Sequence, residues 1–316
     1  MALIDLHQDT PRHTLDPDLD LLQGSGRAQV DLPRLEGGGA LAVGWAACDE
    51  FRLPPAESAA RVTRMFVGAR DLIARSGGRL RLVTRASDLD ACAPGGPVGV
   101  LLALEGAHSL VGSLAMFDAY HALGLRILVL TWNHRNPFAS GCRDAIDEGL
   151  TPLGRELILR AQRLGVVLDL SHASPRTFVE ALALLDRPFL VSHTACAALQ
   201  PHPRNLTDAL MRAVADRAGV LGIMLYPPFL AGPDVPVSAA TVAAHVKHAV
   251  AVAGEEAVAI GTDFDGMPVV PMDLRGFQDL PRLAAALTAI GLGAATIEKV
   301  MWRNAARVLR AGLREG

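Results

Sequence analysis

The sequence predicts a (β/α)8 barrel, the TIM-type α/β fold. Eight short apolar runs alternate along the chain with longer stretches in which apolar residues recur at helical spacing, as expected for a parallel sheet covered by helices. Several runs contain few polar residues, which is typical of parallel strands buried on both faces. An open doubly wound sheet is the alternative, but no glycine-rich phosphate loop follows the first run, which disfavours it.

The eight predicted strands are short apolar runs. Their residue ranges are 2–6, 40–47, 98–104, 125–131, 166–170, 189–192, 220–225 and 258–262.

The stretches between the strands predict helices with one buried face. In the first of them Val62, Met65, Phe66 and Ala69 recur at helical spacing, and Gly77 and Gly78 predict its end. The predicted helices cover 57–78, 109–123, 151–164, 174–185, 207–218 and 238–253.

Two of these helices begin with a hydroxyl residue directly before a proline, at Thr151-Pro152 and Ser174-Pro175. The hydroxyl can accept a hydrogen bond from a free N–H of the first turn, and proline suits the first helical position. The segment from Gly276 to the end predicts helix throughout.

The composition is that of an ordinary globular protein, with 50% hydrophobic residues, 20% charged residues and a net charge of -3 over 316 residues. We find no linker and no internal repeat, so residues 1–316 are predicted to form one domain. The mild acidity disfavours nucleic acid as a partner. The charge pattern shows no single-sign tail.

The sequence contains no long apolar span, and no secretory signal precedes the first motif, so we expect a cytoplasmic protein without a membrane partner. The four cysteines are scattered and form no C-x-x-C pair, which indicates reduced, structural thiols.

Metal-binding residue types stand at the carboxyl ends of five predicted strands. They are His7 and Asp9, Glu105, His172, His193, and Asp263. In a barrel these strand ends meet at one mouth, where enzymes of this fold have their active sites. Each residue alone has a simpler explanation, such as a helix cap, a turn or a buried histidine. Together they indicate a metal centre, because burying so many polar groups unpaired is costly.

Three imidazoles and two or three carboxylates suit Zn²⁺, with Mn²⁺, Fe²⁺ and Co²⁺ as alternatives. Six groups exceed one tetrahedral site, so we expect two metals with a bridging carboxylate. On the residues alone, Asp263 is expected to be a further ligand.

With these residues in place, the sequence resembles the renal-type (membrane) dipeptidase family, zinc peptidases among the amidohydrolase-like metal-dependent hydrolases. The resemblance covers nearly the whole chain, and the order of its blocks is specific. The matching blocks are DLHQD, QVDLPRLEGGGALAVGWA, LALEGAHSL, LDLSHAS, VSHTACAAL, HPRNLTD, LYPPFL, IGTDFDG and MWRNAARVL.

The resemblance implies a binuclear zinc dipeptidase that hydrolyses dipeptides with a hydroxide bridging two Zn²⁺ ions. It implies that His7, Asp9 and a bridging Glu105 hold one ion, and that Glu105, His172 and His193 hold the other. It also implies a homodimer.

The resemblance assigns two further roles. Asp263 becomes the proton acceptor and donor beside the bridging water instead of a ligand. Arg204 corresponds to the arginine that grips the terminal carboxylate of the substrate, for which a bidentate guanidinium is well suited.

One departure from the family concerns the end of the fourth strand. Mammalian-type members carry T-H-N there, and that histidine contacts the substrate carbonyl, whereas this chain reads LTWNHRNPF. Trp132 takes the place of the histidine, either as a substrate contact or as a hydrophobic wall, and His134 is the alternative for the same space. Tyr226 is expected to line the pocket or simply to end its strand.

Two other functions remain open on the sequence. The Trp132 departure is compatible with hydrolysis of another small amide or a lactone, such as an N-acyl amino acid. A catalytically inactive metal-binding barrel is the third alternative, although all presumed ligands and Asp263 are present.

Overall fold

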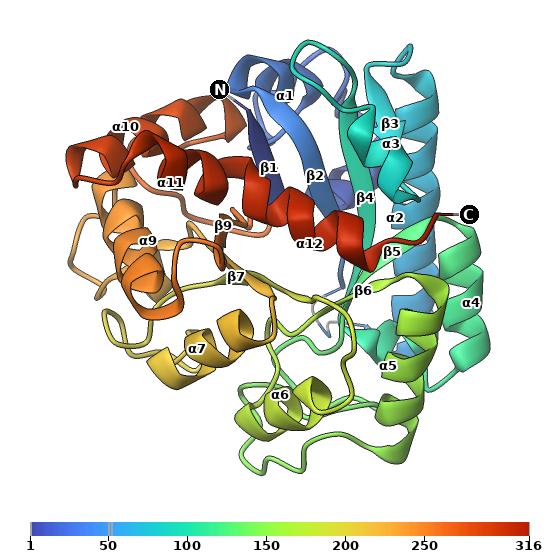
Figure 1. Cartoon of the computed structure of the whole chain (residues 1–316). Helices are drawn as coiled ribbons and strands as arrows, with labels where there is room; N and C mark the ends of the chain where they lie inside the picture. Colours follow the sequence, from blue (N-terminus) through green and yellow to red (C-terminus); the bar gives the residue numbers. More distant parts are fainter. Residues whose placement is uncertain (1, 50, 52, 316) are drawn as a thin grey trace.

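The eight predicted strands form a closed, fully parallel barrel (Figure 1). The structure is a computed structural model that describes residues 2–49, 51 and 53–315. β1 pairs with β2 and β9, and β2 also pairs with β4, which closes the sheet. The barrel strands are β1 Leu3–Gln8, β2 Ala40–Ala47, β4 Val98–Glu105, β5 Leu125–Val129, β6 Val167–Asp169, β7 Leu190–Thr194, β8 Val220–Ile223 and β9 Val258–Ile260. The prediction of a (β/α)8 fold is therefore confirmed.

A ninth strand, β3 Leu80–Leu82, was not predicted. It pairs with the first residues of β4, on the side where β5 pairs with the last residues of β4. Only Leu80 of this strand is buried, and Arg81 is exposed. A three-residue strand with one buried position is too short to produce a periodic sequence signal.

Helices follow the strands around the outside of the barrel (Figure 1). The α-helices are α1 Leu32–Gly38, α2 Pro55–Arg75, α3 Ala86–Asp90, α4 Leu114–Ala122, α5 Pro152–Leu164, α6 Pro175–Leu182, α7 Asp208–Asp216, α8 Pro227–Leu230, α9 Ala239–Ala253, α10 Leu280–Ala289, α11 Ala294–Glu298 and α12 Asn304–Gly312. Short 3-10 turns at Thr10–Leu15, Ala107–Leu110 and Phe277–Asp279 and a π turn at Lys299–Arg303 complete the set. Within the described ranges, none of the helices combines the length and the apolar character needed to cross a bilayer.

The predicted caps of α5 and α6 are confirmed. The Thr151 hydroxyl accepts a hydrogen bond from the backbone N–H of Gly154, and the Ser174 hydroxyl accepts one from Thr177. Each helix has a proline in its first turn.

The prediction of continuous helix after Gly276 is wrong. α10 ends at Ala289, and α11 begins only at Ala294. Gly291 between them has φ +89°, a left-handed conformation that ends a helix and that glycine adopts without strain. The predicted helix over 109–123 is broken in the same way near Gly112, which has φ +71°.

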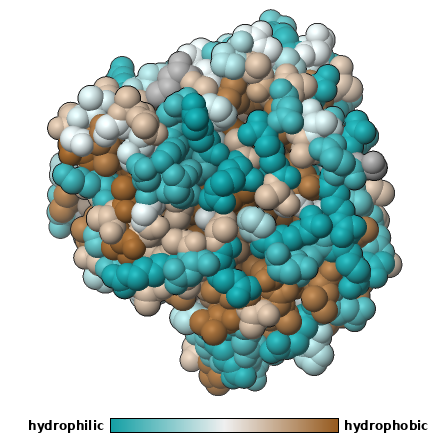
Figure 2. All heavy atoms as spheres, in the orientation of Figure 1, coloured by the Kyte–Doolittle hydropathy of each residue, from teal (hydrophilic) through white to brown (hydrophobic). Residues whose placement is uncertain are grey.

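α12 closes the amino-terminal end of the barrel, where it crosses in front of the strands in Figure 1. Its buried residues Ala305, Val308 and Leu309 belong to the same apolar cluster as Ile4 and Leu101 of the strands. On this face, shown in Figure 2, hydrophilic and hydrophobic residues interleave. Since one end of the barrel is filled by apolar packing, the polar strand ends lie at the opposite mouth.

Candidate metal centre

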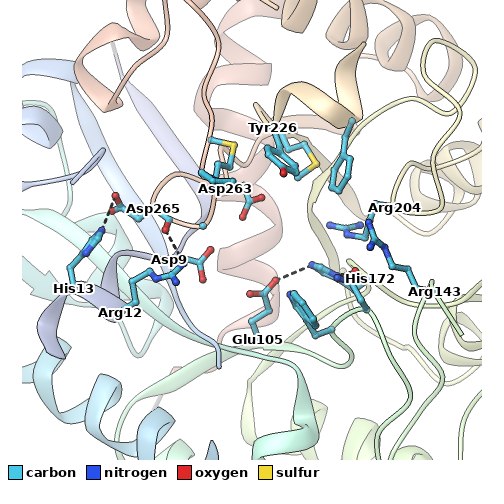
Figure 3. A pocket seen from close by; sticks show the side chains of 17 residues that line it. Asp9, Arg12, His13, Glu105, Arg143, His172, Arg204, Tyr226, Asp263 and Asp265 are labelled. Atoms are coloured by element: carbon cyan, nitrogen blue, oxygen red, sulfur yellow. Dashed lines mark hydrogen bonds and ion pairs between the residues drawn. The ribbon is translucent and has the colours of Figure 1, made fainter. Parts of the chain in front are cut away.

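A cavity of about 590 Å³ opens at the carboxyl ends of the strands. Figure 3 shows its lining, with Asp9, Glu105, His172, Asp263 and Arg204 directed toward a common space. His7 and His193 are buried, and their Nε2 atoms lie 3.6 and 3.4 Å from Oε1 of Glu105, which lines the cavity. The structure therefore brings all six predicted strand-end residues to one site.

Glu105 lies at the centre of this cluster. Its Oε1 is 3.0 Å from Nε2 of His172, 3.4 Å from Nε2 of His193 and 3.6 Å from Nε2 of His7. Two of the three groups of potential ligands among the described residues contain Glu105, namely His7 with Asp9 and Glu105, and Glu105 with His172 and His193. Within each set the ligand atoms lie within 4.8 Å of one another, and Glu105 belongs to both.

The donor atoms fit metal ions. Nε2 of His7 is buried and has no hydrogen-bond partner among the described residues. Nε2 of His172 and Nε2 of His193 face each other at 2.9 Å. Two imidazole nitrogens at this separation can both lie ~2.0–2.1 Å from a single ion, the usual zinc–nitrogen distance. An ion at the first set would satisfy the unpaired Nε2 of His7, and an ion at the second set would bind the two nitrogens that face each other.

Electrostatics around the two sets are unequal. Burial lowers the pKa of His172 to about 3, and Arg204 adds to the effect. Burial also holds the pKa of His193 well below its usual range. Both rings are therefore neutral at pH 7, which is the metal-binding form of imidazole.

Three carboxyl groups, those of Asp9, Glu105 and Asp263, surround His7, and their mutual repulsion favours a positive charge at this place. Burial opposes protonation of His7, but Glu105, Asp9 and Asp263 together raise its pKa to about 10. Burial, with Glu105 adding to it, raises the pKa of Asp9 well above its usual range. Without a metal ion, His7 and Asp9 therefore tend to keep their protons, because the carboxyl groups of Asp9, Glu105 and Asp263 lie close together. A bound cation would supply the same charge and release them.

Asp263 is held beside Asp9 by the backbone. Its N–H donates to the carbonyl of His7 at 3.0 Å, and the Asp9 N–H donates to the carbonyl of Phe264 at 2.8 Å. Asp263 has φ +64°, a strained conformation for a residue other than glycine. Burial raises its pKa to about 7, with His7 opposing the shift.

Gly266 permits this close approach of two carboxyl groups. A Cβ atom at position 266 would lie 2.3 Å from Oδ2 of Asp9 and 2.9 Å from Oδ1 of Asp263. Any side chain there would displace one of the two carboxylates.

Arg204 enters the cavity from the segment between β7 and α7 and is 4% exposed. Its Nη2 donates to the carbonyl of His193 at 3.0 Å, while its Nε is buried without a hydrogen-bond partner among the described residues. Arg143 lies beside it in Figure 3. This wall of the cavity therefore offers unused donors for an anionic group.

Trp132 and Tyr226 both line the cavity and are partly buried. The Trp132 ring stands between the rings of Phe51 and His172, with 6.1 Å between centroids on each side, and it lines the cavity. Tyr226 also lines the cavity, with its ring edge-on to Phe229.

His134 lies apart from these residues. Its side chain is 55% exposed, its Nδ1 is 3.7 Å from Oδ1 of Asp144, and it is not among the residues that line the cavity. This position gives no support to the expectation that His134 binds substrate.

Several supporting residues were not singled out from the sequence. Asn133 Oδ1 is 3.0 Å from Nδ1 of His172. Asp5 accepts hydrogen bonds from the N–H and the hydroxyl of Thr262 at 2.8 and 2.6 Å and from Nε2 of Gln8 at 2.7 Å. Burial raises the Asp5 pKa to about 6. The available signals were the place of Asp5 two residues before His7, and the place of Asn133 at the asparagine of the family's T-H-N pattern.

Solved structures resemble this chain over its whole length. A metallo-peptidase called dipeptidase AC, of family M19, shares 26% identity and a TM-score of 0.91, covering 100% of this chain and 99% of that one. A metallo-peptidase from Rhodobacter sphaeroides, bound to a phosphinate mimic of the dipeptide L-Ala-D-Ala, shares 25% identity and a TM-score of 0.90, with 99% of both chains covered.

The sequence comparisons agree with the structures. An uncharacterized dipeptidase from Schizosaccharomyces pombe is 34% identical over 220 residues, which is 68% of this chain. The match covers 53% of that protein, so the matched part spans about half the relative's length. The pattern of the membrane dipeptidase family, peptidase family M19, matches residues 1–313. The chain therefore belongs to the membrane dipeptidase family.

Proposed function

We propose that this protein is a metallo-dipeptidase that hydrolyses the peptide bond of dipeptides at two divalent metal ions. The observation that carries the proposal is the double set of ligand atoms that share Glu105. The unpaired Nε2 of buried His7 and the facing nitrogens of His172 and His193 support it.

The ion held by His7, Asp9 and Glu105 and the ion held by Glu105, His172 and His193 would be Zn²⁺. Imidazole and carboxylate donors in small numbers suit zinc, and neutral His172 and His193 need no deprotonation to bind it. When bound, the two ions supply Lewis-acid activation of water and of the scissile carbonyl.

Asp263 would be the general base and acid. Its Oδ1 is 4.0 Å from Nε2 of His7, at the edge of the ligand sets, and its carboxyl group lines the cavity. A carboxylate whose pKa is raised by burial takes a proton from the attacking water and returns it to the leaving amine. The peptide bond then breaks with no net change in protons on the enzyme.

Arg204 would bind the terminal carboxylate of the substrate. A guanidinium that is buried and has an unused Nε can form charge-assisted hydrogen bonds to a carboxylate. Since Arg204 and the ligand sets border one cavity of about 590 Å³, a carboxylate held at Arg204 limits substrate length. Trp132 and Tyr226 would form the walls beside the substrate.

A second candidate is hydrolysis of an N-acyl amino acid, which also presents an amide and a terminal carboxylate. The observation that favours it is Trp132, whose ring stacks toward His172 and makes that wall of the cavity aromatic.

The deciding experiment is a substrate panel on metal-replete enzyme. Dipeptides varied in side chain and in L or D configuration are compared with tripeptides and with N-acetyl amino acids of the same C-terminal residues. We expect turnover of free dipeptides and no turnover of tripeptides. Hydrolysis of the acyl amino acids alone would replace the first proposal by the second, and turnover of neither class would refute both.

A further inference from the structure

The Ser192 hydroxyl lies between two of the proposed metal ligands, one from each set. Its Oγ is 2.9 Å from Nδ1 of His193 and 3.3 Å from Nδ1 of His7. All three residues are buried, with exposures of 0–1%. No other hydroxyl among the described residues has a recorded contact with both rings.

The donors and acceptors of this group can be counted. Nε2 of His7 and Nε2 of His193 face Glu105, so each neutral ring that binds a metal there carries its proton on Nδ1. A serine oxygen has two lone pairs and one hydrogen. Ser192 can therefore accept from both Nδ1–H groups at once and still donate its own hydrogen.

The remaining hydrogen has a partner on the neighbouring strand end. Ser171 Oγ is 3.3 Å from Ser192 Oγ, and it donates in turn to Oδ1 of Asp169 at 2.8 Å. Ser171 Oγ also accepts from the backbone N–H of His193 at 3.2 Å. The result is one directed chain of hydrogen bonds that runs from two imidazoles through two hydroxyls to a buried carboxylate.

Asp169 anchors this chain. Its Oδ1 also accepts from the backbone N–H groups of Ser171 and Ser192, at 2.9 and 3.0 Å. Its Oδ2 is buried without a hydrogen-bond partner among the described residues, and Asp169, His7 and His193 bring ligand-type atoms within 4.8 Å of one another. Through Ser171 and Ser192 this carboxylate is linked to the Nδ1 atoms of both rings, and this link favours the tautomer that leaves Nε2 free.

The backbone of Ser192 is confined as well. A Cβ atom at Gly222 would lie 2.0 Å from the Ser192 carbonyl oxygen, and one at Gly261 would lie 1.8 Å from it. The backbone of β8 at Gly222 and the backbone after β9 at Gly261 therefore pack directly against the Ser192 carbonyl group, which limits how far the Ser192 backbone can move.

We propose that Ser192 is a positioning residue shared by both metal sites, which orients His7 of one set and His193 of the other, with Asp169 anchoring it through Ser171. The inference rests on the two-metal centre proposed above, but not on the substrate. His172 is different, because its Nδ1 is paired with Asn133 Oδ1 at 3.0 Å. The Ser192 hydroxyl thus contacts one histidine of each metal site, whereas Asn133 contacts a histidine of one site only.

The test measures metal affinity, not activity. Metal-free parent enzyme, Ser192→Ala, Ser192→Thr, Ser171→Ala and Asn133→Ala are titrated with Zn²⁺ against a chromophoric chelator. Co²⁺ absorption spectra report the ligand geometry, and the melting temperature of each metal-free variant reports folding. Loss of an outer partner of a ligand typically costs ~10–100-fold in metal affinity.

We expect Ser192→Ala to weaken both binding steps by ~10–100-fold, with altered Co²⁺ spectra for both ions, and Ser192→Thr to restore them. Asn133→Ala should weaken one step only. Unchanged binding by Ser192→Ala, or weakening of a single step, would overturn the proposal. If Ser192→Ala does not fold, Ser171→Ala decides: it leaves both Nδ1 contacts but releases the anchor, so it must weaken both steps to a smaller extent.

The outcomes for the proposed function are separate. A parent enzyme that binds two ions but hydrolyses no dipeptide refutes the dipeptidase activity and leaves the role of Ser192 to the titrations. A parent enzyme that binds a single ion refutes the shared role together with the two-metal centre.

Discussion

Nε2 of His172 and Nε2 of His193 lie 2.9 Å apart, on the ends of neighbouring strands, and both face Oε1 of Glu105. Burial keeps both imidazoles neutral, so each presents a lone pair to the same small space. This arrangement makes sense as a preformed site for a cation, and Glu105 extends it to a second ligand set.

Glu105→Gln should therefore impair both metals together. The amide keeps the shape but removes the charge that the two sets share, so we expect weaker binding of both ions and activity lower by at least ~100-fold. Metal analysis after dialysis and a dipeptide assay measure this. Glu57→Gln, at an exposed position in the first turn of α2, is the matched control and should bind two equivalents. Loss of one ion alone from Glu105→Gln would contradict the bridging role.

Asp263→Asn should separate catalysis from metal binding. Removal of a general acid–base typically costs ~10²–10⁴-fold in rate, while metal content should stay at the parent level because Asp263 belongs to neither ligand set. Near-parental kcat in this variant would exclude the proposed role.

The pH profile should report the same group. Asp263 must be ionised to accept a proton, so activity should fall as the pH drops through its pKa. Burial raises that pKa from 3.8 to about 7, and bound cations pull it back down, so the acid limb of kcat should lie between these two values. The measurement is kcat against pH for the parent at saturating metal, and a limb below pH 3.8 would contradict the burial effect.

Arg204→Ala should raise KM more than it lowers kcat. Loss of a hydrogen bond to a charged group costs ~1.5–3 kcal/mol, which corresponds to roughly 10–150-fold in kcat/KM for a free dipeptide. A dipeptide amide, which lacks the terminal carboxylate, is the matched control. If the variant loses as much on the amide as on the free dipeptide, Arg204 does not bind that carboxylate.

Gly266→Ala should disrupt the site without a change in charge. The added methyl group would meet the carboxylates of Asp9 and Asp263, so we expect weaker metal binding and strongly reduced activity. Gly37→Ala in α1 is the control, since a Cβ there meets nothing within 4 Å. The control should be neutral or stabilising by about 0.5–1 kcal/mol in chemical denaturation. A fully active Gly266→Ala would show that the two carboxylates do not need this approach.

Most of the barrel could be predicted because its strands lie in apolar runs that are buried almost throughout, as in the three-residue strands β6 and β9. Thr151 and Ser174 add local cap signals. β3 was missed because three residues with one buried side chain show no period. The break after α10 was missed because Gly291 acts through its φ angle, and the surrounding composition is helical.

By itself, the sequence determined the residue types and their places at the ends of the strands, because strand order and side-chain alternation are local properties of the chain. From that, the gathering of His7, Asp9, Glu105, His172, His193 and Asp263 could be expected. Only the tertiary structure decided which atoms face one another. In the folded protein the Ser192 hydroxyl lies between the rings of His7 and His193, which are far apart in the sequence. The side chain of His134 is 55% exposed and does not line the cavity. Distances of this kind depend on how the strands stagger and pack across the barrel, as at Gly222 and Gly261, and no local pattern encodes them.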